Sequence, residues 1–182
     1  MPRVGLVVGK FCPLHRGHQL LIEFAQARCD QLVILSYTKP EFAGCAPAQR
    51  ARWLGALYPA ATRLVLDDAE LAAFAARTAT PQRILPDNDA PDAEQRAFVG
   101  WVCTDVLGLA VDAVFTSEDY GDGFAAALTD IFRAAGRRSA PVEHACFDRH
   151  RVQAPVSGTA VRGDPVAFHR DLPEVVARSY RP

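Results

Sequence analysis

The chain has 182 residues, 49% of them hydrophobic and 23% charged, a composition typical of a globular protein with one sizeable core. Twenty basic residues against 21 acidic ones give a net charge of −1, so charge gives no reason to expect binding to nucleic acid or to an anionic membrane. No apolar run approaches the roughly 20 residues of a membrane span. Near the start of the sequence, Lys10 and Pro13 interrupt the apolar residues before they reach the length of a signal peptide. Five cysteines without a C-x-x-C pair predict free thiols and a cytoplasmic protein.

The apolar segments alternate in a way that predicts a doubly wound α/β domain with a parallel sheet. A strand over 3–11, a helix over about 17–29 and a strand over 31–37 form a βαβ unit, which requires a right-handed crossover. The alternation continues with a helix at 47–57, a strand at 63–66, a short helix at 69–76, a surface loop at 80–91, a helix at 93–107, a strand at 113–116, a helix at 124–135, a strand at 142–147 and a short helical region ending at Tyr180. No repeat or linker divides the chain, which predicts a single domain over 1–182.

The turn after the first strand is the first place to look for a ligand, because such sheets bind ligands at the carboxyl ends of their strands. Residues 9–18 read GKFCPLHRGH. Gly17 lets the backbone approach a ligand, and the first amides of the following helix are donors for an anion. His15 and His18 add two side-chain donors. The spacing suits a cradle for a polyphosphate.

This turn has three other possible interpretations. A P-loop is excluded, because only three residues separate Gly5 from Gly9 and Phe11 stands where the metal-binding hydroxyl belongs. A metal site made of Cys12, His15 and His18 lacks the fourth ligand that structural zinc sites have. Two histidines that merely cap a helix or lie on the surface are not excluded by this motif alone.

A second motif lies near the other end of the chain, where residues 156–162 read VSGTAVR. Ser157 and Thr159 are good helix-capping residues, and Arg162 lies one turn beyond Thr159. Hydroxyls and a guanidinium at a helix start form a second phosphate-type site, although a capped helix with a solvated arginine is the alternative. Two such helix starts in one α/β chain favour phosphate binding.

Together the two motifs resemble those of the nucleotidyltransferase superfamily of HxGH enzymes, and within it the nicotinamide mononucleotide (NMN) adenylyltransferase domain of the NadR type. Three further stretches resemble that group in the same order, so that the resemblance extends over about 4–180: PAQRARWL at 47–54, VFTSE at 114–118 and FDRHRVQAPVSGTAVR at 147–162. The resemblance implies a Rossmann-like nucleotidyltransferase fold.

The reaction that the resemblance implies joins NMN and ATP to give NAD and pyrophosphate. The NMN phosphate attacks the ATP α-phosphorus directly, and as an anion it requires no general base. By family analogy His15, His18 and Arg162 are catalytic, with His18 nearest the α-phosphate. The implied ATP-binding residues are Gly9, Phe11, His15, Gly17, His18, Ser157, Thr159 and Arg162. Mg²⁺ would be carried with ATP on phosphate oxygens and water, so no metal site on the protein is expected.

The acceptor site rests on weaker signals. Lys10, one of only two lysines, is expected to contact a substrate phosphate. Arg50, in the Arg-x-Arg-Trp segment, is a candidate for the NMN phosphate, with a solvated helix face as the alternative. Trp101 is the candidate for stacking on the nicotinamide ring, with a core position as the alternative. Ser117 follows the strand at 113–116 and is expected to line the cleft.

The sequence also departs from the group. Gly158 replaces a small side chain, and Arg149 and His150 replace a more acidic pair, which leaves the acceptor open. Neither a kinase half nor a DNA-binding segment is expected. The alternatives are another acceptor (phosphopantetheine, FMN or a phospho-alcohol), a pyridine-nucleotide sensor without turnover, and a metal-binding protein. The expected partners are ATP and NMN, without nucleic acid or membrane, and a homo-oligomer is left open.

Overall fold

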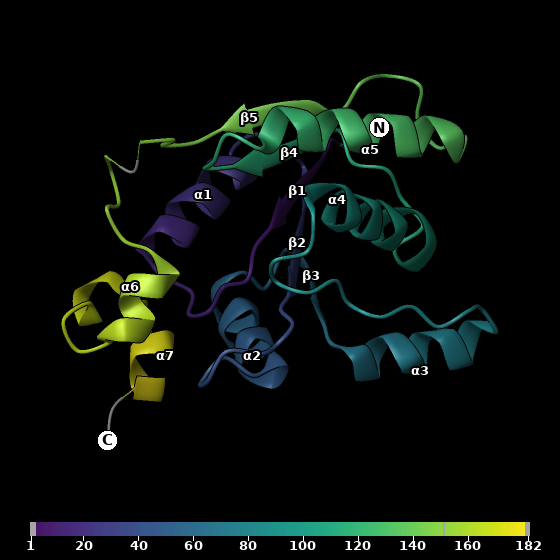
Figure 1. Cartoon of the computed structure of the whole chain (residues 1–182). Helices are drawn as coiled ribbons and strands as arrows, with labels where there is room; N and C mark the ends of the chain where they lie inside the picture. The colour runs from purple at the N-terminus through teal and green to yellow at the C-terminus, as the bar shows by residue number, and fades with distance from the viewer. Residues whose placement is uncertain (1–2, 151, 181–182) are drawn as a thin grey trace.

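The centre of the molecule is a five-stranded parallel sheet with the strand order β3-β2-β1-β4-β5 (Figure 1). The computed structural model describes residues 3–150 and 152–180; Arg151, within the stretch 147–162 quoted above, lies outside them. The strands are β1 (Val4–Val8), β2 (Gln31–Tyr37), β3 (Thr62–Leu66), β4 (Ala113–Thr116) and β5 (Glu143–Cys146). The predicted doubly wound α/β fold, Rossmann-like in its strand order, is confirmed.

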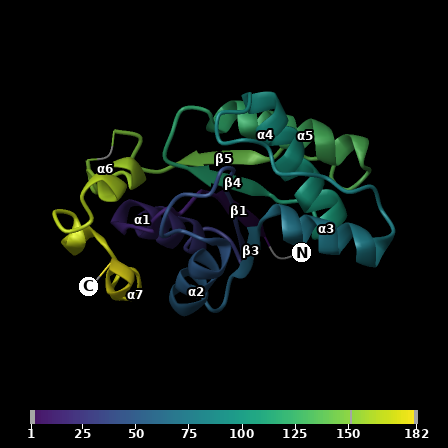
Figure 2. The same ribbon diagram turned by 60° about the horizontal axis from the view of Figure 1, so that its bottom comes forward.

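The helices cover both faces of this sheet. Their bounds are α1 (Arg16–Gln26), α2 (Pro47–Leu57), α3 (Asp68–Thr78), α4 (Asp92–Trp101), α5 (Gly121–Ala134), α6 (Gly158–Gly163) and α7 (Glu174–Ala177). Figure 2 shows α1 and α2 on one side of the sheet and α4 and α5 on the other. No helix within the described ranges is long and apolar enough to cross a membrane.

Each face of the sheet carries its own core. In β1 the side chain of Val7 belongs to the cluster under α1 and α2, whereas that of Leu6 belongs to the cluster under α4 and α5. Because successive strand residues point to opposite faces, a strand buried on both sides needs a continuous apolar run, and the sequence VGLVV supplies it. β1 is thus buried on both faces, as its place in the middle of the sheet requires.

The ligand-binding edge of the sheet follows from the order in which the chain forms the strands. From β1 the chain moves outward to β2 and β3, then returns to β4 on the other side of β1. The loops that leave the carboxyl ends of β1 and β4 therefore diverge, and the crevice between them is where open α/β sheets bind ligands.

Several predicted bounds differ from those observed: α1 ends at Gln26 and α5 begins at Gly121, and the largest differences are in β1 and α4. The strand expected over 3–11 ends at Val8, because Phe11 has a φ of 50°, in the left-handed region, and the chain turns away from the sheet. The helix expected over 93–107 is α4 over its first part, and a π-helical turn, Val102–Val106, continues it. The segment 80–91 is a loop, as predicted.

Candidate functional site

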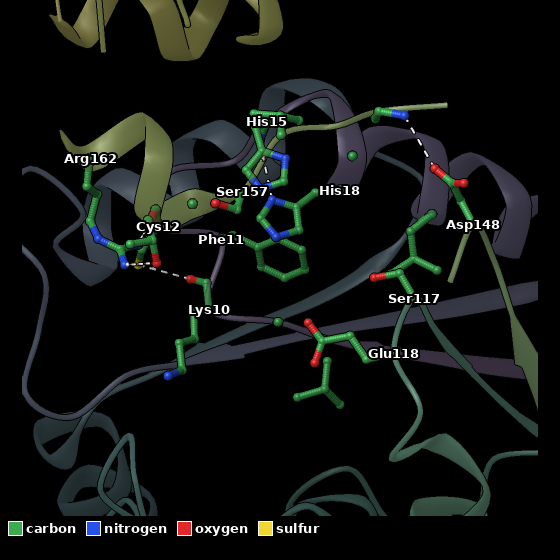
Figure 3. Close-up of a pocket in the computed structure, with 18 of the residues that line it drawn as sticks. Lys10, Phe11, Cys12, His15, His18, Ser117, Glu118, Asp148, Ser157 and Arg162 are labelled. Carbon is green, nitrogen blue, oxygen red and sulfur yellow. Dashed lines mark hydrogen bonds between the residues drawn. The ribbon is translucent and has the colours of Figure 1, made fainter. Parts of the chain in front are cut away.

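A cavity of about 380 Å³ opens at the carboxyl ends of β1 and β4. Its walls come from the loop after β1, the start of α1, the residues that follow β4 and β5, and the start of α6. In Figure 3, His15 and His18 lie one above the other over Phe11. The figure places Ser157 and Arg162 to one side of them and Ser117, Glu118 and Asp148 to the other. Segments from both ends of the chain thus share one cavity.

The two histidines are held by each other and by the start of α1. His15 is the N-cap residue, and its backbone N–H donates to Nδ1 of His18 at 3.3 Å. The two rings stack at 3.8 Å between centroids, and the His18 ring meets Phe11 edge-on at 5.0 Å. Since Nδ1 of His18 accepts a hydrogen bond, the proton of the neutral ring lies on Nε2. His18 can therefore donate from Nε2 to a ligand oxygen.

Phe11 and Gly9 line the cavity next to the two histidines. Phe11 is buried, and its ring lies so close to Gly9 that a Cβ there would stand 2.9 Å from ring carbons. At Gly17 a Cβ would stand 3.1 Å from the His15 ring, so this glycine lets the ring lie against the helix start. The two glycines thus leave room for the rings of Phe11 and His15.

The motif at 156–162 forms another wall of the main cavity. Ser157 caps α6 by accepting a hydrogen bond from the backbone N–H of Ala160 at 3.1 Å. Arg162 donates to the Thr159 hydroxyl at 3.1 Å and, through Nη1, to the backbone carbonyl oxygen of Cys12. A direct hydrogen bond therefore ties this motif to the loop after β1.

Phe42, which the sequence did not single out, completes this wall. The Arg162 guanidinium lies over its ring, with Cζ at 4.1 Å from the centroid, and the Lys10 Nζ lies 5.8 Å from the same centroid. A cation over an aromatic face is attracted by the ring quadrupole. The loop between β2 and α2 thus contributes an aromatic support for two cations of the site.

Lys10 lies between the main cavity and a second one. This second cavity, of about 230 Å³, shares Val8, Gly9 and Lys10 with the first. On its far side the Tyr37 hydroxyl donates to Oε1 of Gln95 at 2.8 Å. No motif in the sequence points to this pair, although Tyr37 ends a strand at the ligand-binding edge. Ser117 lies in the main cavity, as expected.

Arg50 is not brought to either cavity. It is fully buried in α2, where it donates to Ser36, Glu41 and the Cys45 carbonyl. Its side chain therefore lines neither cavity and does not lie on a solvated helix face either.

Trp101 is also not brought to either cavity. Its half-buried side chain packs against Phe98 at 5.8 Å and Phe74 at 6.0 Å, with the Arg83 guanidinium 5.0 Å from its ring. It lines neither cavity and packs instead against the core under α4 and α5.

The thiol of Cys12 is buried in the loop after β1. Its Sγ points at the Lys10 carbonyl oxygen at 3.1 Å, and a hydrogen bond with Cys45 together with burial raises its pKa far above the usual range. Over residues 3–150 and 152–180, no group of three or more histidine, cysteine or acidic side chains is arranged to hold a metal ion. The geometry does not support a metal site at Cys12, His15 and His18.

Charge in the main cavity is mixed, with a basic side and an acidic side. Arg162 and Lys10 stand on the first, Glu118 and Asp148 on the second. The Asp148 carboxylate accepts hydrogen bonds from two backbone N–H groups in the loop after β5, from Val152 at 2.8 Å and from Gln153 at 2.9 Å. Its negative charge is thereby used to fold that loop beside the cavity.

No family model and no curated protein matches the chain. Solved structures do match. One is the NadR protein in complex with NAD and AMP-PNP, with a TM-score of 0.64, 18% identity, and coverage of 99% of this chain and 47% of that one. Another is the NadR protein in complex with NR, with a TM-score of 0.64, 19% identity, and coverage of 99% and 46%. The chain spans about half the length of these neighbours and shares the fold of that half.

Proposed function

We propose that the chain is a nucleotidyltransferase that joins NMN to the adenylyl group of ATP and releases pyrophosphate. The observation that carries the proposal is the single cavity in which the start of α1 meets the start of α6, linked by Arg162 and the Cys12 carbonyl. The fold shared with NadR structures that contain NAD, AMP-PNP and NR supports it, as do the sequence motifs.

The triphosphate of ATP would lie along the basic side of the main cavity. Its α-phosphate would face His18 and the amides at the start of α1, where the helix dipole favours negative charge. Its β- and γ-phosphates would face Ser157, Thr159 and Arg162. The volume of about 380 Å³ falls within the usual range of ligand pockets, about 300–1,000 Å³.

The reaction would be an in-line displacement. An oxygen of the NMN phosphate forms a bond to the α-phosphorus, the bond from that phosphorus to the bridging oxygen breaks, and pyrophosphate leaves with the electron pair. The attacking oxygen is already an anion, so no residue has to remove a proton. The chain's own contribution is to orient the phosphates and to donate hydrogen bonds, from Nε2 of His18 above all, to oxygens that gain charge.

The acceptor would occupy the second cavity, with Lys10 at the junction. There the Lys10 ammonium would contact the NMN phosphate, and the NMN base would extend toward Tyr37 and Gln95. This arrangement uses Lys10 but neither Arg50 nor Trp101, and Ser117 would face the ATP side, because it lines the main cavity. Mg²⁺ would be carried with ATP and would supply positive charge beside its phosphates.

The test is pyrophosphate release from ATP and Mg²⁺ with NMN, nicotinate mononucleotide, phosphopantetheine and FMN supplied one at a time. Release with NMN, accompanied by an equal amount of NAD, is the expected result. Release with a different acceptor alone would keep the phosphate chemistry and refute the NMN assignment. Binding of NAD without release from any mixture would favour a sensor over an enzyme.

A further inference from the structure

The buried arginine in α2 calls for an explanation, because a guanidinium is costly to remove from water unless its donors are satisfied. Arg50 is 0% exposed. Each of its three side-chain nitrogens donates a hydrogen bond. Nε donates to the Cys45 carbonyl at 3.0 Å, Nη1 to the Ser36 hydroxyl at 2.7 Å and Nη2 to Glu41 Oε1 at 2.7 Å. The planar fork of an arginine is required to reach all three at once.

One branch of this network ends at the loop after β1. The Ser36 hydroxyl donates to the Lys10 carbonyl oxygen at 3.1 Å. Because Arg50 can only donate, the Ser36 oxygen accepts from it, and the single hydroxyl proton is left to point at Lys10. Arg50 thereby fixes the direction of the hydrogen bond from Ser36 to Lys10, which holds the backbone of the loop after β1.

The other branch ends at the aromatic support of Arg162. Glu41 and Cys45, both held by Arg50, flank Phe42 in the loop between β2 and α2. The Phe42 ring carries the Arg162 guanidinium at 4.1 Å. Holding the segment 41–45 at both ends therefore fixes the surface on which Arg162 lies.

We propose that Arg50 is a positioning residue of the triphosphate site: it touches no substrate, and it sets Arg162 and the loop after β1 through Phe42 and Ser36. This role rests on the proposed binding of ATP in the main cavity. Lysine at this position would keep the charge but lose the fork, so that the two branches could not be held together.

The experiment compares Arg50→Lys with Arg63→Lys. Arg63 is a suitable control because it also donates to several carbonyl oxygens, those of Tyr58, Pro59 and Ala61, yet none of these lines the cavity. The dissociation constant of ATP is measured by calorimetry, KM for ATP and for NMN by pyrophosphate release, and folding by thermal unfolding. Arg50→Lys is expected to weaken ATP binding roughly tenfold, the scale of a misplaced binding group, and to raise KM for NMN as well, because Lys10 belongs to the loop that Ser36 holds. Arg63→Lys is expected to leave both substrates unaffected.

Phe42→Leu provides a second variant that keeps an apolar side chain and removes the aromatic face. It too is expected to weaken ATP binding, and the double variant with Arg50→Lys is expected to lose less than the product of the two single losses, because one branch is shared. If Arg50→Lys fails to fold, Phe42→Leu decides alone: unchanged ATP binding in it overturns the proposal. Unchanged ATP binding in a folded Arg50→Lys, or a loss of ATP binding no greater than that of Arg63→Lys, would also overturn it.

These outcomes separate the positioning role from the proposed reaction. A wild-type protein that binds ATP without releasing pyrophosphate would refute the reaction, and the dissociation constants of the variants would still decide the role of Arg50. A wild-type protein that does not bind ATP would overturn both.

Discussion

Replacement of Gly158 by alanine tests whether the loop after β1 and the start of α6 act as one site. A Cβ at this position would stand 2.9 Å from the Cys12 carbonyl oxygen and 3.1 Å from Nη1 of Arg162. Ordinary contacts of a Cβ begin at 3.4 Å. The added methyl group therefore pushes α6 away from the loop by about 0.5 Å and crowds the hydrogen bond that joins them.

The size of the effect follows from this displacement. A misplacement of about 1 Å can cost about 10²-fold in rate, so a shift of half that size is expected to lower kcat/KM for ATP about tenfold, or about 1.4 kcal/mol. The assay is pyrophosphate release at varied ATP, with thermal unfolding measured alongside. Gly163→Ala, at the other end of the same helix, is the control, because a Cβ there meets nothing within 4 Å. Identical kinetics for the two variants would refute the reasoning.

Three further predictions concern other parts of the molecule. His18→Ala is expected to slow pyrophosphate release about 10²–10³-fold with little change in the midpoint of thermal unfolding, and turnover like that of the wild type would remove His18 from the mechanism. Gly121→Ala is expected to lower the free energy of unfolding by about 1–3 kcal/mol in a urea titration, because a Cβ there would stand 1.9 Å from Nε2 of His144; an unchanged urea midpoint would refute that close contact. Burial raises the pKa of Cys103 from 9.0 to about 12, so the folded state keeps a proton that the unfolded state loses above pH 9. The free energy of unfolding should therefore fall as pH rises past 9, by up to ~1.4 kcal/mol per pH unit from this thiol, and the fall should be shallower in Cys103→Ala; equal slopes would contradict the burial.

The fold was largely predictable because its signals are local. The strand at 31–37 and the helix at 47–57 are observed with the predicted bounds, since periodicity and the proline at the helix start are read within a few residues. The end of β1 was not predictable in this way. Phe11 indicates burial, but its side chain is buried under His18 while its backbone has left the sheet, and an apolar residue gives no information about φ.

The same distinction separates the parts of the candidate site. The two histidines and Ser157 belong to short motifs whose geometry is set by the helix start beside them. Whether Arg50 faces a ligand or the core depends instead on Ser36 and Glu41, which lie in other segments of the chain. One signal was present: Trp53 and Leu54, three and four residues further along α2, share its face and are buried.

The short helix α6 shows why the two motifs depend on each other. A helix of six residues is not stable alone, so its position must come from contacts with the rest of the chain. Those contacts are the buried side chain of Val161, the close approach of Gly158 to Cys12, and the hydrogen bond from Arg162. An anion that bridges the starts of α1 and α6 would add a further contact between the same two segments. By linkage, such a ligand stabilises the arrangement that binds it, so the order of α6 and the occupancy of the cavity must rise together.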